Sequence, residues 1–249
     1  MIIKGDSVTE CWLRALISIA DGSGSELSPF IANFKANGDT PAYKDELESD
    51  LNKYLQGIGK NTIETTASTI FPKSLAGGSQ STIFERFDKV WPYVKKDTQN
   101  RKGHYFRRLY AFTGHDGKPL NQLQHIIDTY NGKGTRNAVH RRSALIALTF
   151  DPNKDHTSQA LRGFPCMQQI CLAPNGKTKK LHLNAIYAMQ HLCNRAYGNY
   201  IGLENLGNFM AEKMGLELDK INCIASVLEL KMTKQKAKEI ANKYRKYAQ

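Results

Sequence analysis

The clearest periodic pattern of apolar positions lies near the N-terminus. The positions that share a helical spacing are Val8, Cys11, Trp12, Ala15, Leu16 and Ile19. Just before them, Ser7 and Glu10 have the Ser-x-x-Glu spacing in which each side chain can satisfy a free backbone N–H of the other. Gly22 and Gly24 then interrupt the pattern. The sequence therefore predicts a first helix over residues 7–20.

Similar patterns predict further helices and several strands. Helices are expected over 43–55, 81–93, 120–130, 203–214 and 233–247. Strands are expected at 30–34, 144–150, 167–173, 181–187 and 221–228. Asn175-Gly176-Lys177 is a tight-turn signal, because asparagine and glycine tolerate the positive φ of a hairpin. The two strands that flank this turn are therefore predicted to be antiparallel.

These elements predict an α/β (α+β) fold in which a mixed sheet is packed by helices. The 249 residues, of which 41% are apolar, suffice for one large core. The chain contains no internal repeat, low-complexity tract or segment with the composition of a linker. We therefore expect a single domain over residues 1–249.

Composition also bounds the environment of the protein. No apolar run approaches the ~18 residues that span a bilayer, and the N-terminal residues 1–6 lack the order of a secretory signal. The five cysteines form no Cys-x-x-Cys pair, and their odd number argues against a disulfide framework. The expectation is a cytoplasmic protein with reduced thiols and no membrane partner.

No metal site is expected from the histidines. The seven histidines are scattered, and His182 and His191 are too far apart for one helical face and have no carboxylate nearby in the sequence.

A net charge of +12 favours anionic partners such as nucleotides, polyglutamylated folates or nucleic acid, through an attraction that salt weakens. Part of this charge lies in residues 231–246, where seven cations outnumber a single Glu239. This segment fits either a solvated helix face or a surface that binds RNA.

Six short segments between residues 69 and 217 carry candidate chemistry in a fixed order. They are Phe71-Pro72 followed by Glu85, Gly103–Phe106, Asn121-Gln122, Arg141-Arg142, Pro165-Cys166, and Gly198–Leu203 leading to Ala211–Leu216. In this order the segments resemble the thymidylate synthase and pyrimidine hydroxymethylase superfamily. The resemblance implies a large, mainly antiparallel sheet and a homodimer formed through that sheet.

The resemblance implies that Cys166 is the nucleophile. Carbon 5 of a pyrimidine nucleotide is a poor nucleophile until a thiolate adds at carbon 6. A free thiol is mostly protonated at neutral pH, so cationic neighbours are needed, with Arg162 and the Arg141-Arg142 pair as candidates. By the same resemblance, 5,10-methylenetetrahydrofolate donates the one-carbon unit, while Glu85 and Tyr105 organise water and relay protons.

The resemblance also implies the residues that bind substrate. Arg141 and Arg142 would reach across a dimer interface to the substrate phosphate of the partner subunit. Asn199 would read the pyrimidine ring with an amide that both donates and accepts. His191 occupies the place of an aspartate in the family and could contact a different base or sugar.

The chain departs from the family pattern at three places. The family's Arg-Ser-x-Asp, which binds phosphate, is replaced by residues 188–191, Ala-Met-Gln-His. The sugar-binding His-x-Tyr has no counterpart at residues 226–230, and the C-terminal residues 243–249 do not match the tail that closes over folate. Arg195 or Lys73 could compensate for the missing phosphate ligand.

Each candidate also has an ordinary structural interpretation. Cys166 could be a small buried hydrophobe, Arg141 and Arg142 surface charges, Glu85 a surface carboxylate, Tyr105 a core aromatic, Asn199 a helix N-cap and His191 a structural residue. Two other classes of function therefore stand beside the transferase. One is a non-catalytic homologue that binds nucleotide or RNA through its basic surface, and the other is thiol chemistry of a different kind.

Overall fold

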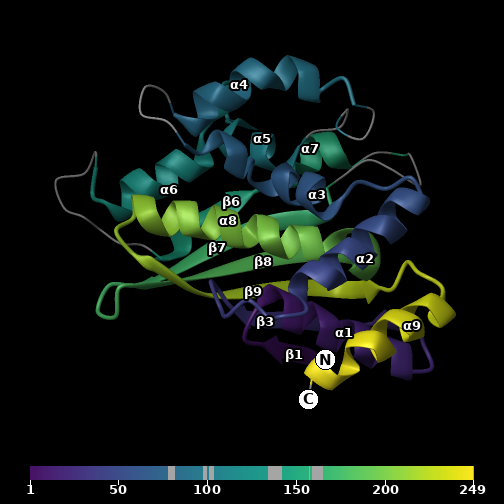
Figure 1. Ribbon diagram of the computed structural model, residues 1–249. Coiled ribbons are helices and arrows are strands. Elements are labelled where there is room, and N and C mark those ends of the chain that lie inside the picture. The colour runs from purple at the N-terminus through teal and green to yellow at the C-terminus, as the bar shows by residue number, and fades with distance from the viewer. Residues whose placement is uncertain are drawn as a thin grey trace.

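A seven-stranded mixed sheet forms the centre of the computed structural model, which describes residues 1–77, 82–97, 100, 104–133, 142–156, 158 and 165–248 (Figure 1). The strand order is β1-β3-β9-β8-β7-β6, with the short β2 beside β9. The strands are β1 (Ile2–Gly5), β2 (Glu26–Leu27), β3 (Phe30–Lys35), β6 (Ile146–Leu148), β7 (Met167–Asn175), β8 (Lys180–His191) and β9 (Glu217–Glu229). A separate two-stranded sheet pairs β4 (Phe112–Thr113) with β5 (Pro119–Leu120).

Most neighbouring strands of the large sheet are antiparallel. The exceptions are β1 with β3 and β8 with β9, which are parallel. β7 and β8 form the expected hairpin, and the Asn175 carboxamide oxygen accepts from the backbone nitrogens of Lys177 and Thr178 at 3.1 and 3.2 Å. The predicted mixed, mainly antiparallel sheet is therefore confirmed.

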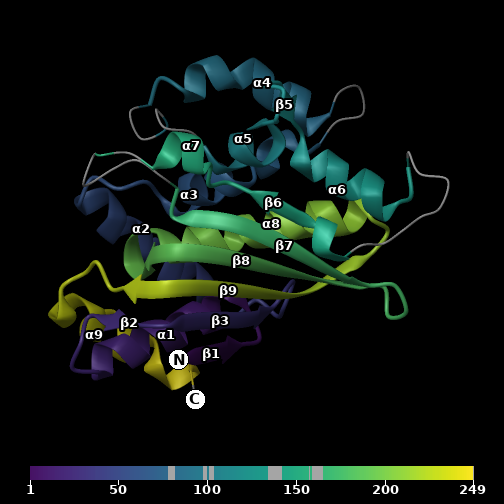
Figure 2. The same cartoon turned by 180° about the vertical axis from the view of Figure 1, so that it is seen from behind.

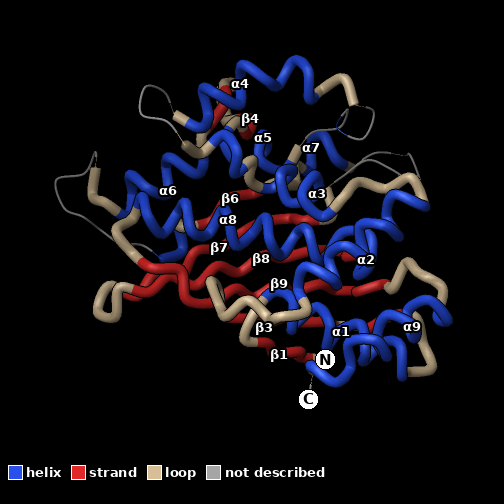
Figure 3. Tube along the Cα trace, viewed as in Figure 1, coloured by secondary structure: helices blue, strands red, loops and turns tan. Residues whose placement is uncertain are grey.

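Helices lie on one side of this sheet and above one end of it (Figure 3). They are α1 (Val8–Asp21), α2 (Lys44–Gly57), α3 (Ile63–Ile70), α4 (Ile83–Val94), α5 (Tyr105–Tyr110), α6 (Gln122–Tyr130), α7 (Pro152–Asp155), α8 (Tyr197–Lys213) and α9 (Lys234–Tyr244). Short turns are η1 (Lys73–Leu75), η3 (Arg142–Ala144), the π-helical turn η4 (Leu192–Ala196) and η5 (Arg245–Tyr247). None of the described helices combines the length and the apolar character needed to cross a bilayer.

Most of the expected helices are present near their predicted bounds, but α8 was predicted too short. It begins at Tyr197, six residues before the expected start at residue 203. The two glycines of its first turns, Gly198 and Gly202, weaken the local helical signal. Tertiary packing overrides that weakness, because both glycines are buried against α3.

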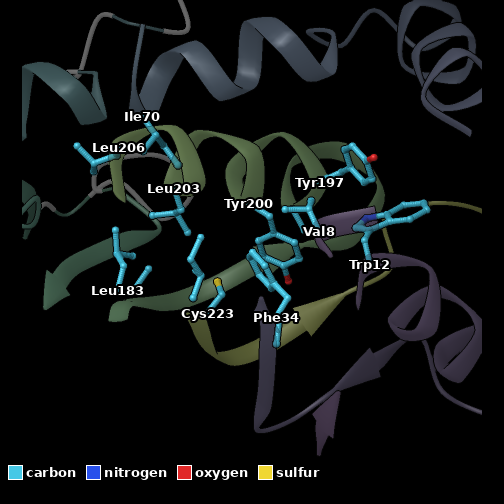
Figure 4. Packing of buried hydrophobic residues seen from close by; sticks show 14 of the residues in the cluster. Val8, Trp12, Phe34, Ile70, Leu183, Tyr197, Tyr200, Leu203, Leu206 and Cys223 are labelled. Atoms are coloured by element: carbon cyan, nitrogen blue, oxygen red, sulfur yellow. The ribbon is translucent and has the colours of Figure 1, made fainter. Parts of the chain in front are cut away.

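The core lies between α8 and the inner face of the sheet (Figure 4). Tyr200 of α8 contacts Phe34 of β3 with ring centroids 5.3 Å apart, and both side chains are fully buried. The Tyr200 hydroxyl donates to the Gln190 side-chain oxygen at 3.1 Å. Its polar tip is thus satisfied inside the core, as buried tyrosines require.

The glycines of α8 allow an unusually close approach to α3. A Cβ added at Gly198 would lie 2.7 Å from the Ile63 carbonyl oxygen, and one added at Gly202 would lie 2.6 Å from the Ala67 carbonyl oxygen. Positions four apart lie on one face of a helix, so the two glycines together form a flat surface against which α3 packs. Side chains at these two positions would force the helices apart.

The opposite face of the sheet carries no helix in front of β7, β8 and β9 (Figure 2). Two rows of side chains cross this outer face at right angles to the strands. Ile31, Ile224 and Ile186 form an apolar row, since Ile31 pairs with Ile224 and Ile224 with Ile186 in the strand register. The residues of both rows are half-buried by their neighbours rather than covered by another layer.

The second row is a ladder of asparagines, one from each of three strands. The Asn33 side-chain nitrogen donates to Asn222 at 2.5 Å, and the Asn222 side-chain nitrogen donates to Asn184 at 2.7 Å. These cross-strand bonds bind β3, β9 and β8 to one another independently of the backbone ladder.

We expect Gly202→Ala to destabilise the protein by about 1–2 kcal/mol. The overpacking cost of about 1–3 kcal/mol exceeds the roughly 1 kcal/mol that alanine gains over glycine within a helix. Gly57→Ala is the matched control, because a Cβ at this helical glycine meets nothing within 4 Å. It should be neutral or stabilising in the same urea-unfolding experiment. Equal effects of the two substitutions would contradict the close contact.

Candidate functional site

Cys166 lies directly before β7, at the surface of the protein. All five cysteines fall in the described part of the chain, and Cys166 is the exposed one, whereas Cys11, Cys193 and Cys223 are buried and Cys171 is half-buried. The Ala188 backbone nitrogen of β8 donates to the Cys166 carbonyl oxygen at 2.9 Å. The sheet therefore fixes the backbone at Cys166, and the residue itself is exposed.

Tyr105 lies next to this thiol, as the resemblance implies. It is the first residue of α5, and its hydroxyl oxygen accepts from the Met167 backbone nitrogen at 3.3 Å. Burial raises the pKa of Tyr105 to about 12, and the nearby Cys166 contributes to this rise. The hydroxyl is therefore protonated at neutral pH and can donate its proton to the sulfur or to a bound ligand.

Among the described residues, the cation that acts on Cys166 is Arg195. Burial raises the pKa of the Cys166 thiol, and the Arg195 charge opposes this rise. Arg195 lies in the π turn η4, which is fixed at its start because the Trp12 indole nitrogen donates to the Leu192 carbonyl oxygen at 2.9 Å. Such turns place side chains where a regular helix would not. The sequence offered no signal for this turn.

His191, the last residue of β8, stands in the same cationic region. Burial lowers its pKa, and the charges of Lys231, Arg195 and Lys60 lower it further, against an opposing effect of Glu229. The His191 imidazole is therefore neutral at pH 7, with Nε2 3.8 Å from the Glu229 carboxylate. A neutral imidazole can both donate and accept a hydrogen bond.

The expectation that His182 and His191 lack carboxylate partners is wrong. His182 Nε2 lies 2.9 Å from Asp219 Oδ2, and His191 faces Glu229. Both acids come from β9, which is the parallel neighbour of β8 although it is 37 or 38 residues away along the chain. Among the described residues, no three side chains of the metal-ligating types converge on one point.

Asn199 lies in the first turn of α8, four residues after Arg195. Its interpretation as a helix N-cap is wrong, because Ala196 precedes the helix and no side chain caps it. Only 4% of Asn199 is exposed, and its side-chain amide makes no hydrogen bond with a residue that the structure describes.

Glu85 lies in a different place from Cys166. Its carboxylate accepts from the Thr82 backbone nitrogen at 2.7 Å and forms a capping box at the start of α4. This bond lowers the pKa of Glu85 and keeps it ionised. The side chain lines a cavity of about 730 Å³ whose described walls include neither Cys166 nor Tyr105.

Arg142 is also remote from the thiol of its own chain. It is exposed in η3, next to Leu145, whose carbonyl oxygen accepts from Leu172 at 2.9 Å. Leu172 is six residues further along β7 than Cys166, which corresponds to about 20 Å of strand. Arg142 can therefore serve the site only from another subunit. Arg141 and Arg162 lie outside the described residues.

The residues that stand in place of the family's phosphate-binding arginine are not suited to bind phosphate. Gln190 is buried, and its side chain bonds Tyr200 and Cys223 inside the core. Ala188 and Met189 are exposed but uncharged. Arg195 is thus the nearest described cation whose charge reaches Cys166, Tyr105 and His191.

Two cations of the basic C-terminal segment form ion pairs with acids of α1 and α2. Lys243 lies 2.6 Å from Asp50 and 2.7 Å from Glu46, and Arg245 bonds Asp21 at 2.7 and 2.8 Å. These ion pairs favour a structural interface with α1 and α2 over a surface that binds RNA.

Comparison with known proteins gives one partial match, and no family model matches the chain. A protein of Methanocaldococcus jannaschii with the name "Putative thymidylate synthase" is 34% identical over 116 residues. The match covers 45% of this chain and 47% of that protein, so the chain spans about half the length of the curated relative it matches. The match supports a thymidylate synthase-like relationship.

We expect Cys166 to react first among the five thiols with iodoacetamide, and Arg195→Ala to slow that reaction about three- to tenfold at pH 7. Loss of the Arg195 charge raises the pKa of the thiol further, so less thiolate is present, and the pH midpoint of alkylation moves upward. Peptide mass spectrometry across a pH series measures both effects. Lys177→Ala, which removes an exposed positive charge at the tip of the β7–β8 hairpin, is the control and should leave the profile unchanged. A profile equally altered by both substitutions would contradict the role of Arg195.

Proposed function

We propose that the protein is a thymidylate synthase-like transferase that adds a one-carbon unit to carbon 5 of a pyrimidine nucleotide. The observation that carries this proposal is the arrangement of side chains around Cys166, directly before β7. The exposed Cys166 lies beside the half-buried, protonated Tyr105, and the charge of Arg195 acts on its thiol. The partial match to a "Putative thymidylate synthase" and the ordered motifs of the sequence support the same chemistry.

Cys166 would act as the nucleophile. Its thiolate forms a bond to carbon 6 of the ring, and the electrons of the carbon 5–carbon 6 double bond move into an enolate. Carbon 5 then becomes nucleophilic. After carbon 5 has gained its substituent, loss of the carbon 5 proton expels the sulfur and restores the double bond. Arg195 favours the thiolate at the start of this sequence.

Tyr105 and Asn199 would orient the ring. The Tyr105 hydroxyl accepts from the Met167 backbone nitrogen, so its own proton points to another acceptor. Asn199 offers a donor and an acceptor on one planar amide, which suits the neighbouring carbonyl and N3 of a pyrimidine. Neutral His191 would add a contact that does not depend on charge.

The region around His191 fits the anionic part of a ligand. Lys60, Lys231 and Arg195 all act on His191, so three positive charges gather at the end of β8. They would hold a substrate phosphate or the glutamyl carboxylates of 5,10-methylenetetrahydrofolate, which when bound supplies the one-carbon unit. Glu85 is engaged elsewhere and takes no part in this proposal.

We further propose that the protein is a homodimer in which a second copy covers the outer face of the sheet. The isoleucine row of this face continues through Gln169 to Leu148, which is 39% exposed. A long apolar sheet face without a covering layer is typical of an interaction surface. Arg142, which is remote from its own thiol, would then serve the site of the partner copy.

Tritium release tests the chemistry directly. We expect uridine or cytidine nucleotides labelled with tritium at carbon 5 to lose the label to water in the presence of the protein and methylenetetrahydrofolate. Cys166→Ser should slow the release by about a thousandfold or more, because the attacking group is removed. Cys171→Ser is the control and should retain the rate. No release from any pyrimidine nucleotide would count against the transferase and favour the non-catalytic homologue.

Sedimentation tests the dimer. We expect Ile224→Lys to weaken self-association by about a hundredfold or more, because each interface would bury two unpaired ammonium groups. Tyr93→Lys is the matched control, since Tyr93 is 72% exposed on α4, away from this face. A wild-type protein that sediments as a monomer at micromolar concentration would contradict the proposed homodimer.

A further inference from the structure

A cavity lies at the other end of α8 from Cys166. It has a volume of about 730 Å³ and is enclosed by η1 and the facing parts of α4, α6 and α8. Its α8 residues begin at Asn205 and continue to Lys213, about 10–20 Å along the helix axis from Asn199. Small-molecule sites commonly have volumes of about 300–1,000 Å³. The cavity is therefore large enough for a ligand and separate from the thiol.

Phenyl rings form one wall of this cavity. Phe209 is only partly buried, and its ring centroid lies 5.2 Å from that of Phe71 and 6.2 Å from that of Phe84. The Phe71 and Phe84 rings are buried behind it and hold it in place. The Lys213 ammonium lies over the Phe209 ring, 5.8 Å from its centroid, so a flat ligand ring would meet the exposed part of Phe209 in an offset or edge contact.

Carboxamides also line this cavity, and hydrogen bonds fix the orientation of two of them. The Gln124 nitrogen donates to Asp128 and the Asn131 nitrogen donates to the Lys213 carbonyl oxygen, both at 3.0 Å. Asn205 is half-buried, and its amide makes no hydrogen bond with the described residues. These carboxamides can therefore both donate to and accept from a polar edge of a ligand.

The charge of the cavity favours an anion. Its two carboxylates are already engaged, Glu85 by the Thr82 backbone nitrogen at 2.7 Å and Glu212 by the Lys213 ammonium at 3.0 Å. Lys73 of η1 forms no ion pair with a residue that the structure describes, and its side chain is exposed at the rim. The Arg86 guanidinium bonds the Leu75 and Ala76 carbonyl oxygens at 2.6 and 3.2 Å, which fixes η1 in position.

We propose that this cavity binds a flat aromatic molecule that carries an anionic group. Its ring lies against Phe209, its polar edge faces Asn205, and its anion meets Lys73. The inference stands on this cavity alone and does not depend on chemistry at Cys166.

A fluorescent probe of this chemical class tests the proposal. The probe 8-anilinonaphthalene-1-sulfonate has aromatic rings and one sulfonate, and its emission rises and shifts to shorter wavelength in an apolar site. We expect saturable binding to the wild-type protein. Lys73→Glu should weaken it about fivefold or more through charge reversal at the rim, and Phe209→Leu about threefold through loss of the aromatic face. Circular dichroism verifies that both variants fold.

Controls separate this site from other binding. Lys177→Glu makes the same charge change at the exposed tip of the β7–β8 hairpin and should leave the affinity unchanged, as should Cys166→Ser. Naphthalene-1-sulfonate should displace the probe, whereas neutral 1-naphthamide at the same concentration should displace far less. The proposal is overturned by an absence of emission enhancement, by equal effects of the two lysine substitutions, or by equal displacement by the two competitors.

Discussion

The close approach of α8 to α3 determines where the candidate site lies. Gly198 and Gly202 leave room for the α3 backbone, so α8 rests against α3 on one side and the sheet on the other. The chain must therefore leave β8 and enter α8 within one π turn, which is held by Trp12. That turn carries Arg195 and leads directly to Asn199. The positions of both residues therefore depend on the contact that the two glycines of α8 make with α3.

The thiol of Cys166 is subject to two opposing effects. The surrounding protein removes part of its hydration and raises its pKa, while Arg195 stabilises the charged form. The residue nevertheless remains exposed. A nucleophile in this balance is mostly protonated when the site is empty, and a further positive or hydrogen-bonding group brought by substrate or by a partner subunit would increase its reactivity. This arrangement suits a reaction that begins only after the substrate or a partner subunit has supplied the missing group.

Local sequence patterns predicted much of the fold and part of the site. The first helix, the β7–β8 hairpin and the long strands depend on neighbouring residues, so periodicity and turn chemistry sufficed for them. The order of the motifs made Cys166 and Tyr105 candidates, but it did not predict that the Tyr105 hydroxyl accepts from the Met167 backbone nitrogen. The interaction of Arg195 with Cys166, the acids that face His182 and His191, and the early start of α8 could not be predicted in this way. They depend on the parallel pairing of β8 with β9 and on the π turn, which bring together residues distant in the chain.

The asparagine ladder on the outer sheet face has a polarity. Asn33 donates to Asn222 and Asn222 donates to Asn184, so one end of the row keeps an unused oxygen and the other an unused nitrogen. Hydrogen bonds in such a chain polarise one another, which strengthens both ends. In a face-to-face dimer whose two-fold axis is perpendicular to the row, the second row would run in the opposite sense and would set nitrogen against oxygen. Isoleucines alone would accept many rotations of one sheet upon another, whereas a directional row of amides would favour this one.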